Sequence, residues 1–318
     1  MTGQPPLDPR LTEQRNPATA DIDVAEPSRI VELMHAEDRK VGDAVWACRR
    51  EIARAIELVE HAFRSGGHLL YFGAGTSGRL GVLDAAECPP TFGTDPELVQ
   101  GTIAGGAAAL VRSQEGAEDD AAAGAAAVDA KGAGANDVVF GIAASGTTPY
   151  VRGALERGVA RGARAILFAC TDPPADLLQR VDVAIVPKVG PEALTGSTRL
   201  KAGTATKMVL NMVTTGAMIR WGRAYGNLMV DLRALSAKLH DRGERIVMEV
   251  CGVDRETARR AIAEAGGFVK TAIVMLRQDV DRAEAERRLA AAQGYVRKAI
   301  GEAPPPVRAL ADALPPPA

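Results

Sequence analysis

The sequence is poor in aromatic residues: Phe, Trp and Tyr together make up 4% of its 318 residues. So few aromatic side chains argue against a stacking surface for single-stranded nucleic acid. An excess of positive charge is missing as well, because 38 Lys and Arg residues stand against 40 Asp and Glu residues and the formal net charge is -2. A protein of this charge is poorly suited to a phosphate backbone, so we expect no nucleic acid partner.

Patterns of metal ligands and disulfides are also missing. The four cysteines lie far apart without a C-x-x-C pair, and the four histidines form no pair at metal-ligand spacing. We therefore expect no metal site and a reducing compartment. No basic patch leads into an apolar stretch at the N-terminus, and no segment runs apolar for the width of a bilayer. The expectation is a soluble, cytoplasmic protein without a membrane partner.

What is present is the composition of a globular protein, with 47% hydrophobic and 25% charged residues. Short apolar runs typical of buried parallel strands cover residues 68–75, 137–145, 164–170 and 181–187. Helical patterns separate these runs along the chain. Strands that alternate with helices predict an α/β fold in which a parallel sheet is flanked by helices.

Composition divides the rest of the chain. Residues 1–27 are rich in Pro, Thr, Asn and Asp and predict an irregular N-terminal arm, followed by the α/β domain over residues 28–240. Its last long helix, residues 200–222, is apolar around most of its circumference and is expected to be buried in a core or at a subunit interface. Short amphipathic helices predict a small C-terminal helical bundle over residues 241–302, and residues 303–318 form a Pro-rich tail.

Two turns, residues 73–79 and 144–149, each join the end of a predicted strand to a predicted helix. Ligands bind at such positions in open parallel sheets. Glycines in these turns let backbone amides approach an anion, and hydroxyls such as those of Thr76 and Ser77 add donors. Together the two turns predict a phosphate-binding site.

Two alternatives apply to these turns. The first turn reads Gly-Ala-Gly-Thr-Ser-Gly and matches the G-x-G-x-x-G pattern of dinucleotide sites, which is weak evidence alone. The expected acidic residue at the end of a second strand is not clear, and a dinucleotide site does not require a second Ser/Thr-rich turn. Each turn is also compatible with an ordinary helix N-cap. Their occurrence at successive strand ends favours the phosphate site.

Two carboxylates are candidates for chemistry. Glu87 stands at the predicted end of a helix, where the helix dipole disfavours an acid, so stability does not explain it. Glu118 lies in an acidic run that is equally typical of a solvated helix N-terminus. The G-x-S-x-G signature is absent, so Ser77 and Ser145 are better anion donors than nucleophiles.

Five segments carry a resemblance to a known family. Residues 73–93, 115–120, 141–151, 195–212 and 226–231 resemble the N-acetylmuramic acid 6-phosphate etherases of the sugar isomerase (SIS) superfamily. Residues 12–23 and the helical C-terminal part resemble the family too, so the match covers about residues 10–302. The resemblance implies a SIS-type fold that binds a small sugar phosphate.

The resemblance also implies an activity. The family cleaves the ether between carbon 3 of the sugar and D-lactate and yields N-acetylglucosamine 6-phosphate, a carbon-oxygen lyase reaction of cell-wall amino-sugar recycling or catabolism. The open-chain aldehyde acidifies the hydrogen on carbon 2, so lactate can be eliminated and water added back without a metal or redox cofactor. The alternative is a non-catalytic, sugar-phosphate-sensing regulatory protein.

Individual residues follow from the matched motifs. Glu87 and Glu118 fall on the two catalytic carboxylates of the family, with Glu87 in the proton-donor position, although which of them handles each proton stays open. The resemblance assigns phosphate to Ser77, Ser145 and Thr148, and sugar contacts to Thr76, Ser197 and Thr198. Other possible contributors, from the same chain or from a second subunit, are Lys201, Lys238 and His240. The resemblance and the helix over residues 200–222 together predict a homodimer.

Overall fold

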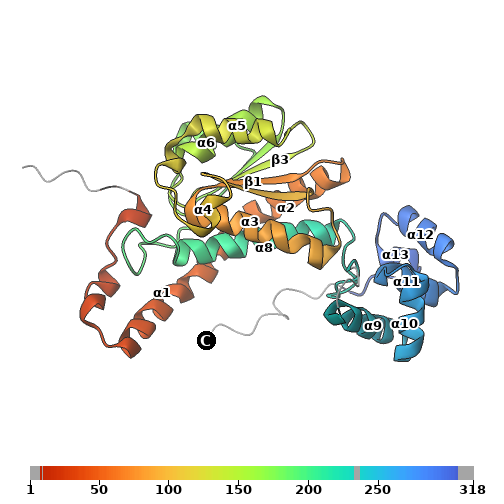
Figure 1. Ribbon diagram of the computed structural model, residues 1–318. Helices are drawn as coiled ribbons and strands as arrows, with labels where there is room; N and C mark the ends of the chain where they lie inside the picture. Colours follow the sequence, from red (N-terminus) through yellow and green to blue (C-terminus); the bar gives the residue numbers. More distant parts are fainter. Residues whose placement is uncertain (1–7, 9, 233–236, 307–318) are drawn as a thin grey trace, which may run out of the picture. The chain divides into compact units, whose positions relative to one another are not determined.

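A computed structural model describes residue 8, residues 10–232 and residues 237–306, without the side chains of residues 237 and 238 (Figure 1). The chain forms two compact units, one ending at Arg220 and the other made of the chain from Trp221 onward together with Thr91–Gly93. The side chain of Lys238, most of the Pro-rich tail and the first residues of the arm lie outside the described residues. The domain bounds expected from the sequence stay predictions.

The first unit is built on a parallel sheet, as predicted. Its strands run in the order β2-β1-β3-β4-β5. Their bounds are β1 Leu69–Gly73, β2 Val99–Ile103, β3 Val138–Ile142, β4 Arg164–Phe168 and β5 Val183–Ile185. This order reverses direction between β1 and β3, and ligands of such sheets bind in the crevice outside the carboxyl ends of those two strands.

Helices cover both faces of the sheet (Figure 1). Their bounds are α1 Pro27–Ala47, α2 Arg49–Arg64, α3 Gly75–Phe92, α4 Ala108–Val111, α5 Ala121–Ala130, α6 Pro149–Ala160, α7 Ala175–Leu178 and α8 Lys201–Arg220. Single 3-10 turns are η1 Leu11–Glu13, η2 Pro17–Thr19, η3 Ile22–Val24 and η4 Ala117–Asp119. Helices α5 and α6 lie on one face of the sheet, and α2, α3 and α8 lie on the other.

Alternation along β1 explains how the layers pack. Leu70 and Phe72 join the core cluster that contains Tyr150 and Leu155 of α6. Tyr71 points to the opposite face, where its hydroxyl donates to a carboxylate oxygen of Asp84 on α3 at 3.0 Å. Because successive side chains of a strand face opposite sides, a strand buried on both faces is apolar throughout.

Helix α3 extends further than the sequence suggests. The expected end was Glu87, before the two prolines, but the helix continues through Pro89 and Pro90 to Phe92. Each proline lacks the N–H that would bond one turn back. The last turn is held by packing, since Cys88 and Phe92 are both buried.

The described part of the N-terminal arm is packed rather than irregular and loose. The backbone N–H of Gly196 donates to the carbonyl of Thr12 at 3.1 Å, and Thr12 is fully buried. The Asn16 side-chain amide donates to the carbonyl of Pro191 at 3.2 Å, and the Thr19 hydroxyl donates to a nearby backbone carbonyl at 2.9 Å. These bonds satisfy polar groups on both sides, so the arm and the loop before α8 form one structure.

The second unit confirms the predicted helical bundle. Its helices are α9 Ala237–Cys251, α10 Arg255–Glu264, α11 Val269–Gln278, α12 Arg282–Ala291 and α13 Val296–Ala299. Val247, Ile262 and Ile273 belong to its apolar core. Across the described residues of both units, no helix has the length and apolar character needed to span a membrane.

Candidate active site

A cavity of about 400 Å³ lies at the carboxyl ends of β1 and β3, where the strand order reverses. We call it the polar pocket. Its lining consists of Arg10, Glu13, Ala74, Gly75, Thr76, Ser77, Glu118, Asp119, Ile142, Ala143, Ala144, Ser145, Thr147, Thr148, Pro149, Gly196 and Thr198. The volume and the concentration of hydroxyls and charges suit a small polar ligand.

The turn after β1 brings Thr76 and Ser77 to the polar pocket. This turn is very tight, because a Cβ atom on Gly73 would lie 2.7 Å from the backbone nitrogen of Gly78. Only glycine permits so close an approach of strand and helix. Thr76 and Ser77 therefore stand in the first turn of α3, where unpaired backbone amides and the helix dipole favour an anion.

The turn after β3 supplies a second group of hydroxyls. Gly146 adopts a positive φ of 70°, which turns the chain into α6 at Pro149. The Ser145 hydroxyl lies 3.4 Å from that of Thr148 and 3.3 Å from that of Thr147. These distances are long for hydrogen bonds between hydroxyls. A bound anion can therefore replace these contacts and accept hydrogen bonds from the hydroxyls.

A third segment, the loop before α8, contributes Gly196 and Thr198 to the polar pocket, whereas Ser197 is not among the lining residues that the structure describes. The loop is anchored by the fully buried Glu192. Its carboxylate accepts the backbone N–H groups of Lys201 and Ala202, both at 2.9 Å. Burial raises the pKa of Glu192, and the two amides act against that rise. Glu192 thus caps α8 and fixes the loop beside the pocket.

The structure separates the two predicted catalytic carboxylates. Glu118 lies on η4 and lines the polar pocket. Glu87 is exposed on α3 and is not among the described lining residues. It stands ten residues beyond Ser77, so its backbone lies about 15 Å further along the helix. The described lining of the polar pocket within one chain therefore contains Glu118 without Glu87.

Lys201 is occupied elsewhere. Its ammonium group is almost fully buried and lies 2.5 Å from the carboxylate of Glu37 on α1, which also accepts Lys40 at 2.5 Å. Burial acts to raise the pKa of Glu37, but the hydrogen bonds from Lys201 and Lys40 outweigh it and lower that pKa to about 2. His240 is exposed on α9 of the other unit. The charge of Lys201 therefore holds α8 against α1 and is not directed into the polar pocket.

Comparison with curated proteins identifies the family. The N-acetylmuramic acid 6-phosphate etherase of Salinibacter ruber is 54% identical over 268 residues, which cover 84% of this chain and 86% of that protein. The enzyme of the same name from Gloeobacter violaceus is 55% identical over 266 residues, covering 83% and 86%. The chain belongs to the N-acetylmuramic acid 6-phosphate etherase family. The resemblance found in the sequence motifs is thereby confirmed.

A family model of the SIS type also matches part of this chain. Residues 51–159 match the family model described as the glucokinase regulatory protein N-terminal SIS domain. Among solved structures, the Vibrio vulnificus NanR protein complexed with ManNAc-6P has a TM-score of 0.41 at 14% identity, with 69% of each chain covered. An Escherichia coli CFT073 protein in complex with A5P has a TM-score of 0.46 at 18% identity, covering 64% of this chain and 97% of that one.

Three charged residues of the polar pocket were not anticipated from the sequence. Asp119 directly follows Glu118 in the sequence, which explains why it also lies at the pocket. Arg10 and Glu13 come from the N-terminal arm, more than 100 residues before Glu118 in the chain. The resemblance of residues 12–23 to the etherase family was the available signal for that segment, but nothing in it indicated a place in the pocket.

Proposed function

We propose that this chain cleaves the D-lactyl ether of N-acetylmuramic acid 6-phosphate and yields N-acetylglucosamine 6-phosphate and D-lactate. The observation that carries the proposal is the 54% identity to an etherase over most of both chains. The polar pocket supports it, because hydroxyls and helix N-termini surround a space that also contains the carboxylate of Glu118. The first step of this reaction eliminates lactate by breaking a carbon-oxygen bond, so the protein is a carbon-oxygen lyase.

The chemistry proceeds by elimination and addition. In the open-chain sugar the aldehyde at carbon 1 acidifies the hydrogen on carbon 2. A carboxylate takes that proton, the electron pair forms a double bond between carbons 2 and 3, and a general acid protonates the departing lactate oxygen. Water then adds its hydroxyl to carbon 3 and carbon 2 regains a proton, so the net change is the addition of one water molecule. Glu118 and Glu87 are the groups to which we assign these proton transfers.

The phosphate of the substrate is assigned to the turn before α6. Ser145 and Thr148 lie in that turn, and Ser77 faces the same pocket from α3. Two helix N-termini converge there, which favours a doubly charged group. We assign sugar contacts to Thr76 and Thr198, which line the pocket, and keep Ser197 as a candidate in the neighbouring loop position.

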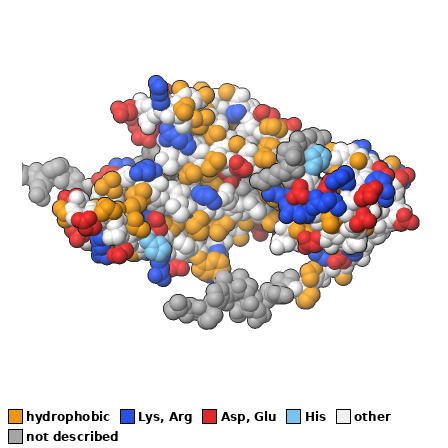
Figure 2. Space-filling view, turned by 60° about the horizontal axis from the view of Figure 1, so that its bottom comes forward, with side chains coloured by type: hydrophobic (Ala, Val, Ile, Leu, Met, Phe, Trp, Pro, Cys, Tyr) orange, Lys and Arg blue, Asp and Glu red, His pale blue; other side chains and the backbone are white. Residues whose placement is uncertain are grey.

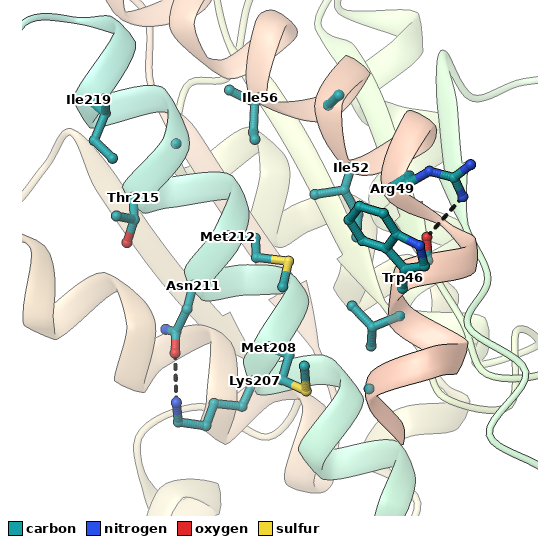
Figure 3. A pocket seen from close by; sticks show the side chains of 14 residues that line it. Trp46, Arg49, Ile52, Ile56, Lys207, Met208, Asn211, Met212, Thr215 and Ile219 are labelled. Atoms are coloured by element: carbon teal, nitrogen blue, oxygen red, sulfur yellow. Dashed lines mark hydrogen bonds between the residues drawn. The ribbon is translucent and has the colours of Figure 1, made fainter. Parts of the chain in front are cut away.

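We further propose that the enzyme is a homodimer whose second copy completes the site. An apolar groove of about 680 Å³ runs between α1, α2 and α8 (Figure 3). Figure 2 brings the α8 side of Figure 1 forward and shows hydrophobic side chains in patches on it. Trp46, Met212 and Ile219 line the groove and are about half exposed, at 51%, 43% and 48%. Exposed apolar residues gathered in this way are typical of a protein interface.

The groove adjoins the helix that carries Glu87. Asn211 lines the groove, and its side-chain amide donates to Asp84 of α3 at 2.7 Å. One residue before Asp84, Leu83 is 51% exposed, and Glu87 follows Leu83 one helical turn later. A second copy seated on this face would contact the turn of α3 that bears Glu87. We therefore assign Glu87 to the polar pocket of the partner copy.

The direct test is incubation of the full-length protein with N-acetylmuramic acid 6-phosphate. We expect release of D-lactate, incorporation of heavy oxygen from water at carbon 3, and incorporation of deuterium from deuterated water at carbon 2. Heavy oxygen in lactate would contradict elimination. Binding of the sugar phosphate without release of lactate would favour the regulatory alternative. We place the activity in the cytoplasm, in recycling or catabolism of cell-wall amino sugars, because all four cysteines are free thiols.

A further inference from the structure

The polar pocket has an unusual charge balance for a site that takes a phosphorylated sugar. Its charged lining residues are Arg10, Glu13, Glu118 and Asp119. Arg10 is the sole cation in the part of the lining that the structure describes. A phosphate carries a charge of about -1.5 to -2 at neutral pH. Hydroxyls and amides are neutral, so they do not balance the phosphate charge beside three carboxylates. The guanidinium of Arg10 is the group in this lining that can act as its counterion.

Arg10 already contacts one hydroxyl of the turn after β3. One guanidinium nitrogen lies 3.4 Å from the hydroxyl oxygen of Thr147, and the Thr147 hydroxyl in turn contacts Ser145 at 3.3 Å. The guanidinium therefore stands at the edge of the group of hydroxyls to which we assigned the phosphate. Planar, multiply donating guanidinium is well matched to a phosphate, which it binds through two parallel hydrogen bonds.

The backbone at Arg10 is held in place. The next residue, Leu11, donates its backbone N–H to the Thr171 hydroxyl at 3.3 Å. Thr12 is fully buried and accepts the backbone N–H of Gly196, a residue of the pocket lining. The arm thus enters the polar pocket at a defined point, and the position of Arg10 follows from bonds on its C-terminal side.

The guanidinium is at present paired with Asp8. Its Nε lies 2.9 and 3.0 Å from the two carboxylate oxygens, and the backbone N–H of Arg10 also donates to Asp8 at 3.0 Å. The hydrogen bonds from Arg10 lower the pKa of Asp8 to about 2, so the carboxylate is ionised at neutral pH. Both side chains are more than one-third exposed. Ion pairs this exposed contribute little stability, so an incoming anion can replace the carboxylate at little cost.

We propose that Arg10 is a phosphate-binding residue that sets the preference of this pocket for phosphorylated sugars, and that Asp8 occupies its guanidinium until the phosphate replaces it. This inference rests on the proposed function for the identity of the sugar, but the anion site itself depends only on Arg10 and the adjoining hydroxyls. It gives the N-terminal arm a role in substrate selection that no motif indicated.

The test measures binding separately from turnover. Calorimetry with N-acetylglucosamine 6-phosphate should show about 10- to 100-fold weaker binding for Arg10→Ala, as expected for loss of a charged hydrogen-bonding partner. The affinity of Arg10→Lys should lie between those of wild type and Arg10→Ala, because lysine keeps the charge and lacks the planar pair of donors. Unphosphorylated N-acetylglucosamine should bind wild type and Arg10→Ala equally. Arg15→Ala is the matched control, because Arg15 lies on the same arm, is exposed and does not line the pocket.

Inorganic phosphate distinguishes failure of this inference from failure of the proposed function. Phosphate should raise the midpoint of thermal unfolding of wild type and of Arg15→Ala, and it should do so much less for Arg10→Ala, whether or not lactate is released from the muramic acid derivative. Equal protection of wild type and Arg10→Ala would overturn the inference even in an active etherase. Asp8→Asn should bind phosphate at least as tightly as wild type, and weaker binding would contradict the exchange with Asp8.

Discussion

The polar pocket and the apolar groove lie on the same unit and differ in how their side chains are supplied. The polar pocket collects hydroxyl-bearing and charged side chains from the ends of β1 and β3, from η4, from the loop before α8 and from the arm. The apolar groove collects mainly apolar side chains from the faces of α1, α2 and α8, with Met208 and Met212 opposite Ile52 and Ile56 in Figure 3. Loop-borne polar groups can adapt to a small charged ligand, whereas helix faces present a fixed apolar surface.

This difference supports the occupant that we proposed for each cavity. Small polar ligands are bound by a few directed hydrogen bonds, which the turns after β1 and β3 provide. A protein surface is bound by buried apolar area around large anchors, which Trp46 and the methionines provide. Helix α8 connects the two, because its first turn is capped beside the pocket and its middle lines the groove. Substitutions can therefore be chosen to affect one cavity, the other, or both.

The largest effect is expected in the polar pocket. Glu118→Gln removes a titratable group while keeping nearly the same volume, so lactate release should fall by about 100- to 10,000-fold. Binding of N-acetylglucosamine 6-phosphate, measured by calorimetry, should change little. Glu97→Gln is the control, since Glu97 is exposed on the same unit and does not line the pocket. Near-normal turnover of the Glu118 variant would remove this residue from the mechanism.

The ion pair between Glu37 and Lys201 should affect both cavities, because it joins α1 to the first turn of α8. Glu37→Gln leaves the Lys201 charge buried without its partner, and the free energy of unfolding should drop by about 3–5 kcal/mol. Chemical denaturation measures the change. Glu32→Gln on the same helix is a matched control, since its pair with Arg29 is exposed and should contribute less than about 1 kcal/mol. Equal losses of unfolding free energy for the two substitutions would show that the buried pair stabilises the protein no more than the exposed pair does.

A substitution in the apolar groove should first affect the formation of the dimer. Met212→Glu places a carboxylate among apolar side chains, and we expect the dissociation constant of the dimer to rise by at least about 100-fold. Light scattering should then give a mass near 33.2 kDa for the variant. Leu178→Glu is the control, because Leu178 is 40% exposed on α7 and lies outside the groove. A wild-type protein that is already monomeric at micromolar concentration would refute the assignment of the groove.

The smallest effect is expected in the pH dependence of stability. The hydrogen bonds from Lys201 and Lys40 lower the pKa of Glu37 from 4.5 to about 2. A lowered pKa adds stability that is fully present above the unfolded value and is lost as pH falls toward the folded value. The gap in unfolding free energy between wild type and Glu37→Gln should therefore narrow between pH 4.5 and about 2. A gap that stays constant over this range would contradict an ionised Glu37 in the folded protein.

Local sequence patterns sufficed for much of the fold. Strands β1, β3 and β4 consist almost entirely of buried residues, and their apolar runs were recognised as parallel strands. Strand β2 was missed, because only Val99 and Ile103 of its five residues are buried at the edge of the sheet. Its burial depends on neighbours that are distant in sequence, and no pattern within the strand shows it.

Part of the lining of the polar pocket was predictable in the same way. Thr76, Ser77, Ser145 and Thr148 follow strand ends directly, so the topology of a parallel sheet brings them together. Arg10 reaches the polar pocket through tertiary contacts of the arm, which no local rule indicates. The separation of Glu87 from Glu118 depends on the length and direction of α3, and in the proposed dimer a second chain would bring the two carboxylates together.

Mixing of two inactive variants tests the shared site most directly. Glu87→Gln and Glu118→Gln chains, each inactive alone, should regain activity when they are mixed and allowed to exchange subunits. If each site takes Glu87 from one copy and Glu118 from the other, a mixed dimer contains one intact site. With equal amounts and random exchange, D-lactate release should recover to about one quarter of the wild-type rate. No recovery, with subunit exchange verified, would place both carboxylates in one chain and contradict the account.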